Sequence, residues 1–200
     1  MAVDAWLSLV VICLLGAISP GPSLALVMRN TMSSGRSAGV KTAIAHGLGV
    51  GLYAAIALTG IGLILVNSSV LFQVIQYLGA MFLIWLAYQT LTNSDATIDV
   101  EHSAKPSLSA WRDGFLLAFL NPKLAIFFIA LFSQFIDANA SLNKNLIMVM
   151  TVSGIDMAWY SIVAWGLSQQ SILPRLQQHS KWLERLMATV LVLLAIRVVW

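Results

Sequence analysis

Two charged side chains lie inside long apolar stretches of this sequence, where a charge is expensive. Asp156 stands in VSGIDMAWYS, and Lys123 stands in FLNPKLAIFF. A charged Asp at the centre of a bilayer costs roughly 2.5–3.5 kcal/mol on insertion scales. A carboxyl that gains and loses a proton is what proton coupling requires, and it could equally meet the amino group of a substrate. The alternative for Asp156 is a structural hydrogen bond to a neighbouring helix. Lys123 could bind a substrate carboxylate, pair with Asp156 in one conformation, or instead extend to the cytoplasmic surface.

Prolines interrupt two of the apolar stretches. The first carries SPGPS at 19–23, and the second carries NPK at 121–123. Proline removes a backbone donor and clashes with an earlier carbonyl, so these motifs predict broken helices. In lipid, such a break is tolerated where the freed backbone groups line a polar cavity, and the helix that follows directs a partial positive charge into it. A carboxylate fits such a place, although prolines also simply kink packed helices. The candidate substrate-binding residues are therefore Ser19, Pro20, Gly21, Pro22, Ser23, Asn121, Pro122 and Lys123, with Asp156 for proton coupling.

The elements that must position these residues are membrane spans. The 200 residues are 59% hydrophobic and only 10% charged, against about 25% charged residues in soluble domains. We expect an all-α fold with six spans, each near the roughly 20 residues that cross the hydrocarbon. Their approximate ranges are 6–28, 42–66, 70–92, 114–136, 145–168 and 182–200. The last is the weakest, because its uninterrupted apolar part is short, and a five-span arrangement is the alternative. The net charge is +3, but the sequence has no basic patch with interleaved aromatics, which argues against nucleic-acid binding.

The spans form two groups of three, and a proline break opens each group. We expect a first repeat at 1–92, a cytoplasmic linker at 93–113 and a second repeat at 114–200, in opposite orientations because three is odd. Matched interruptions in two inverted halves indicate a transporter binding site. Basic residues gather in the loops after spans 1, 3 and 5, so the positive-inside rule places both termini outside the cytoplasm.

Other residues have structural interpretations. Gly47 and Gly51 are four apart, which suits close helix packing. His46 begins the second span beside a basic loop, so we expect it at the membrane interface. Cys13 is the single cysteine, which excludes an internal disulfide; we expect it to pack in the core or face lipid. Tyr53, Trp159 and Tyr160 could line a cavity or simply pack.

These motifs together resemble the lysine-exporter (LysE/RhtB) family of bacterial amino-acid exporters. The matching features are the early Ser-Pro-Gly-Pro, Gly35-Arg36 with Gly39, the glycine-rich second span, YLGAMFLIWLAYQTL at 77–91, and the block from Gly114 to Ile136. The threonine- and homoserine-type branch is the most similar. The resemblance implies export of amino acids across the bacterial inner membrane, driven by an ion gradient that we expect to be protons, with no cofactor. The resemblance implies that residues 20–22 and 121–123 bind the substrate, and that Asp156 corresponds to the acidic residue that many family members carry there.

Two other functions compete with this interpretation. A membrane enzyme needs paired cysteines or a Ser–His or paired-Asp arrangement at depth; the single cysteine disfavours it, and so does Asp156, which we expect to stand alone. A metal-cation exporter needs a cluster of His, Cys, Asp or Glu ligands, which the spans do not show. The sequence leaves the substrate's side chain and the formation of a homo-oligomer open.

Overall fold

The structure, a computed structural model, describes residues 3–19, 21–92, 109–136, 141–167 and 172–199; the side chains of 167, 172–180, 198 and 199 are left aside. Within these residues the chain forms helices and no strand, which confirms the all-α prediction. The helices are α1 (Val3–Ile18), α2 (Pro22–Ser34), α3 (Arg36–Asn67), α4 (Ser69–Thr92), α5 (Ala110–Phe119), α6 (Pro122–Phe132), α7 (Leu142–Leu167) and α8 (Ile172–Val199). Predicted residue Pro20 and most of the predicted linker, 93–108, lie outside the described residues.

Both predicted helix breaks are present. Helices α1 and α2 meet at 56°, and α5 and α6 meet at 54°; each pair together is long and apolar enough to form one bent span. Pro22 is the first residue of α2 and Pro122 the first residue of α6. Proline suits this position because its missing N–H would have no partner inside the helix. At each break, therefore, a proline begins the second helix.

The predicted sixth span is not confirmed. Three single helices are long and apolar enough to cross a membrane, namely α3, α4 and α7 through Gly166, and the bent pairs raise the number to five among the described residues. Helix α8 is not one of them, although it is 28 residues long. The physical reason is that Glu184, Arg185 and Arg197 bracket its apolar stretch on both sides.

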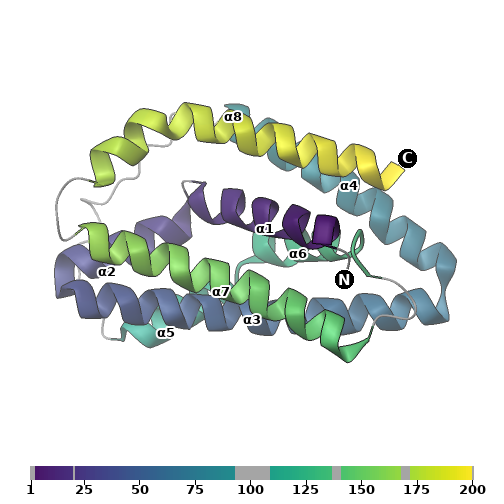
Figure 1. The fold of residues 1–200 in the computed structure, drawn as a ribbon, viewed down its shortest axis with the longest axis horizontal. Coiled ribbons are helices and arrows are strands. Elements are labelled where there is room, and N and C mark those ends of the chain that lie inside the picture. Colours follow the sequence, from purple (N-terminus) through teal and green to yellow (C-terminus); the bar gives the residue numbers. More distant parts are fainter. Residues whose placement is uncertain (1–2, 20, 93–108, 137–140, 168–171, 200) are drawn as a thin grey trace.

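One half of each broken span, α1 and α6, lies inside the bundle (Figure 1). Figure 1 shows α1 between α8 and α4 on one side and α7 and α3 on the other, with α6 behind it. Helix α3 packs mainly against α7 and α5, α4 packs against α8 and α6, and α1 packs against α7 and α8. The continuous helices therefore enclose the two breaks.

Small residues bring α3 and α7 together, as predicted. A methyl group on Gly47 would fall on the Met157 side chain and 3.1 Å from the Ser153 carbonyl oxygen. The Ser153 hydroxyl donates a hydrogen bond of 2.8 Å to the Gly47 carbonyl. On Gly51, a methyl group would lie 3.0 Å from Ser153 Oγ. Glycine at both positions lets the two backbones approach closely.

We expect Gly114→Ala to lower the thermal stability of the protein. A methyl group there would meet the Thr42 backbone carbonyl, and a backbone yields less easily than a flexible side chain. Overpacking of this kind costs about 1–3 kcal/mol. The loss of helical circular dichroism on heating can follow unfolding, because most of the described residues are helical. Gly60→Ala is the matched control, since a methyl group at Gly60 meets nothing within 4 Å; equal melting temperatures for the two variants would contradict the expectation.

Candidate functional site

A cavity of about 130 Å³ lies where the two breaks meet. One break contributes Ser19, Gly21, Pro22 and Ser23, and the other contributes Asn121 and Lys123. The remaining walls come from α1, α3, α4, α6, α7 and α8: Cys13, Gly16, Ala17, His46, Val50, Leu86, Thr90, Leu124, Phe127, Phe128, Val152, Asp156, Tyr160 and Met187. Residues about a hundred positions apart in the sequence thus share one hollow inside an apolar bundle, with polar side chains on part of its wall.

A chain of hydrogen bonds forms one wall of this cavity. His46 Nδ1 lies 2.7 Å from Asp156 Oδ2, and His46 Nε2 lies 2.9 Å from Ser23 Oγ. The side chain of His46 is 2% exposed and that of Asp156 is 13% exposed. The Tyr160 ring packs edge-on against the imidazole, with 5.2 Å between ring centres. This arrangement fixes the imidazole between α2 and α7, beside the carboxylate.

The prediction that His46 lies at the membrane interface was wrong. Helix α3 begins at Arg36 rather than near 42, so His46 lies about three turns inside it, beside the Gly47 and Gly51 contact with α7. The sequence held only a weak signal, namely that His46 is one residue from Gly47, which packs against α7. An ionisable side chain on that face has to be buried in the bundle.

The structure also overturns part of the argument against an enzyme. Asp156 is not isolated, because Ser23, His46 and Asp156 stand in the order of a hydrolase triad with hydrogen-bonding distances. Geometry of this kind is shared by nucleophilic catalysis and by proton relays. The class of protein must therefore be decided on other grounds.

The starts of α2 and α6 differ in their capping. Asn121 Oδ1 accepts a hydrogen bond of 3.0 Å from the Lys123 backbone N–H, so a side chain caps α6. Gly21 precedes α2 and provides no side-chain cap. An uncapped helix start retains backbone N–H groups that favour an anion. Of the two breaks, the start of α2 is the better place for a carboxylate.

The other predicted residues have mixed outcomes. Lys123 lines the cavity with an exposed side chain, and no ion pair joins it to Asp156 among the described residues. Pro122 is not among the lining residues, although its neighbours on both sides are. Tyr160 lines the cavity, whereas Tyr53 packs on Phe119 with 5.6 Å between ring centres. Cys13 is buried in the core, as expected, and also faces the cavity.

Apolar helices around broken helices and an internal polar cavity define a multi-pass membrane protein with a ligand-sized interior. The chain belongs to the family of LysE type translocators, whose model matches residues 14–200. It is therefore a transporter rather than an enzyme, and the family resemblance seen in the sequence is confirmed.

Several relatives carry efflux names. A leucine efflux protein of Klebsiella pneumoniae is 30% identical over 150 residues, covering 72% of this chain and 70% of the relative. A threonine efflux protein of Salmonella typhi is 26% identical, covering 84% of each chain. The membrane protein YrhP of Bacillus subtilis is 25% identical, covering 88% of this chain and 89% of the relative. No solved structure matches the chain.

Proposed function

We propose that this protein exports neutral amino acids from the cytoplasm in exchange for protons. The observation that carries the proposal is the cavity at the two helix breaks, with the Ser23–His46–Asp156 chain on its wall and Lys123 at its edge. The efflux names of the leucine and threonine relatives agree with this function.

The substrate's carboxylate has two groups to meet. The uncapped start of α2 offers backbone N–H groups beside Ser23, and the Lys123 ammonium lies on the same cavity. Hydrogen bonds that involve a charged group are worth about 1.5–3 kcal/mol. Together these groups favour a carboxylate over a neutral solute.

The substrate's amino group and the proton compete for one carboxylate. Asp156 Oδ2 is paired with His46, and no hydrogen bond among the described residues uses Oδ1, so this oxygen remains for an ammonium. A proton added to the His46–Asp156 pair cancels its net negative charge and weakens that attraction. Proton and ammonium then exclude each other, which is the condition for antiport.

The rest of the cavity suits an uncharged side chain. Its walls are largely apolar, with Val50, Leu86, Leu124 and Phe127 among them. Burying a second charge against such walls costs free energy. We therefore include leucine, threonine and homoserine among the expected substrates and expect lysine to be a weaker one.

Two inverted halves could move against each other around this cavity. In support, α3 of the first half packs on α5 and α6, and α7 of the second half packs on α1 and α2. Each half thus surrounds the other's broken helix, as a pseudo-twofold arrangement requires. With α8 as a sixth span, both termini would lie on the periplasmic side of the inner membrane.

The test is counterflow of radiolabelled amino acids in proteoliposomes, with a pH gradient applied in parallel. We expect leucine, threonine or homoserine to exchange, and an inward proton gradient to drive net efflux. Protection of Cys13 from a maleimide provides an independent binding assay, because this is the only thiol in the chain and it lines the cavity. Failure of every amino acid in both assays, or movement of divalent metal instead, would overturn the proposal.

A further inference from the structure

Glu184 on α8 is a buried carboxylate with an unused oxygen. The residue is 7% exposed, and its Oε2 has no hydrogen-bond partner. It stands in a stripe whose next members, Met187, Ala188 and Leu191, are buried apolar residues. Its neighbour Arg185 is exposed, so the acid occupies the core-facing side of the helix. An uncompensated buried acceptor destabilises a protein, and more so when it is charged.

A second unused acceptor lies on the facing helix. Gln89 Oε1 on α4 is buried without a partner, and α4 packs against α8. The two helices run in opposite directions (Figure 1). Leu86 on α4 and Met187 on α8 both line the cavity. Because the two helices are antiparallel, Gln89, three residues after Leu86, and Glu184, three residues before Met187, lie toward the same end of the bundle. Both oxygens therefore belong to one end of the α4–α8 contact, about one turn from the cavity wall.

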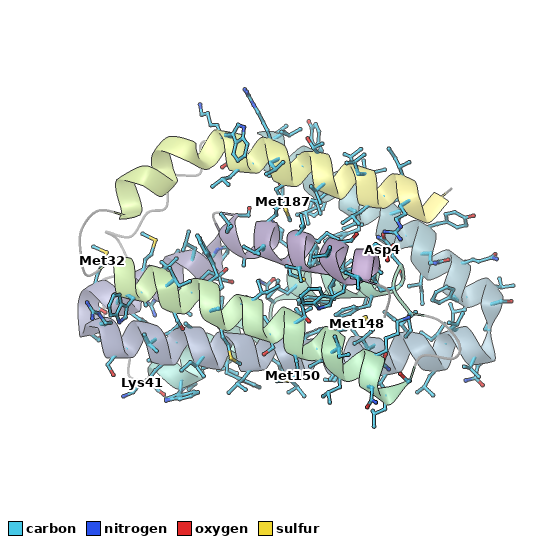
Figure 2. The ribbon with its side chains drawn as sticks, viewed as in Figure 1. Asp4, Met32, Lys41, Met148, Met150 and Met187 are labelled. Carbon is cyan, nitrogen blue, oxygen red and sulfur yellow. The ribbon has the colours of Figure 1, made fainter. Side chains whose placement is uncertain are left out.

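Met187 links this place to the cavity. Its side chain extends from α8 toward α1, as Figure 2 shows, and its methyl lies 3.8 Å from the position of a methyl group on Gly16. Thr90 lines the cavity one residue beyond Gln89. Glu184 and Gln89 do not themselves line the cavity, so a ligand group has to pass Met187 and Thr90 to reach them.

We infer that Glu184 and Gln89 form a second ammonium-binding position at the α4–α8 end of the cavity. A primary ammonium has three N–H donors and a positive charge. Glu184 Oε2 and Gln89 Oε1 each lack a donor, and an ammonium supplies one to both. The inference rests on the proposed function, since the amino acid supplies the ammonium. Asp156 is partly engaged by His46, so the substrate would meet Glu184 in one position and Asp156 in the other as it moves through the cavity.

The experiment measures protection of Cys13 from maleimide in purified protein by three probes: L-leucine, 3-methylbutylamine, which lacks the carboxylate, and 4-methylpentanoate, which lacks the amine. We expect Glu184→Gln to weaken protection by leucine and by the amine roughly tenfold or more, as loss of a charge-assisted hydrogen bond predicts. Protection by 4-methylpentanoate should not change. Asp4→Asn is the matched control, because it removes an exposed carboxylate of α1 and should leave all three probes unaffected.

The outcomes separate this inference from the proposed function. Equal protection of wild type and Glu184→Gln by the amine would overturn the ammonium position and leave amino-acid export standing. Failure of leucine to protect wild type, together with absent counterflow, would remove both. Should Glu184→Gln fail to fold, Gln89→Leu tests the same position, with a smaller selective loss for the amine expected and an unchanged result overturning the inference.

Discussion

Replacing His46 by Gln, or Asp156 by Asn, is expected to abolish proton-driven net efflux; His46→Gln should retain amino-acid exchange, whereas Asp156→Asn should weaken it, because Asp156 also meets the substrate's ammonium. The two side chains share a 2.7 Å contact at a site where both are largely buried. A positioned proton-transfer group typically contributes about 10²–10⁴-fold to a rate. Proton-driven transport should therefore fall by roughly two to four orders of magnitude.

The physical reason is that each variant removes a different part of one proton site. Gln at 46 cannot carry the proton, and Asn at 156 cannot attract it. Because the pair acts as a unit, the double variant should transport no worse than either single variant, which is a non-additive result. Net efflux under a pH gradient measures coupling, and counterflow without a gradient measures the remaining exchange.

The controls separate coupling from folding. Asp4→Asn removes an exposed carboxylate and should keep full coupling. Ser23→Ala keeps the His46–Asp156 contact and should reduce transport less than either charged variant. Unchanged gradient-driven efflux in Asp156→Asn would show that the coupling role is wrong.

Filling the cavity should have an equally large effect. Gly16 lines the cavity, and a methyl group there would lie in ordinary contact, 3.8 Å from the Met187 methyl and 4.0 Å from the Phe127 ring. The backbone therefore accepts a side chain at this position, but a phenyl group would extend into a hollow of only about 130 Å³. We expect Gly16→Phe to fold and to lose both net efflux and exchange, to background.

The comparison with a second position makes this prediction specific. Gly60→Phe adds the same side chain on α3 at a place where an added methyl group has no neighbour within 4 Å, so it should insert and transport normally. The melting temperature and the maleimide reactivity of Cys13 report whether each variant folds and whether its cavity is filled. Normal exchange by a folded Gly16→Phe would place the transport route elsewhere.

Much of the architecture could be predicted from local chemistry. Proline at 22 and 122 dictates where helices begin, because its ring forbids the preceding turn and suits the first position of the next helix. The glycines at 47 and 51 indicated a close helix contact, since nothing else fits between two touching backbones. These features depend only on neighbouring residues, which is why the tertiary structure retains them. The charges on both sides of the apolar part of α8 likewise made it the weakest of the predicted spans.

The candidate site could be predicted only in part from the sequence. Asp156 was a candidate because a carboxyl in an apolar stretch is expensive wherever the helix lies, and the two proline breaks were candidates for the same kind of local reason. Sequence alone could not assign His46, because its burial depends on α3 starting six residues early and on α7 approaching across the glycines. Nor could it pair Ser23 with a histidine 23 positions away, or leave one oxygen of the Glu184 carboxylate without a donor. Local backbone chemistry determined where the helices break; only packing between distant helices, which sets burial and brings partners within 3 Å, decided which polar groups share the cavity.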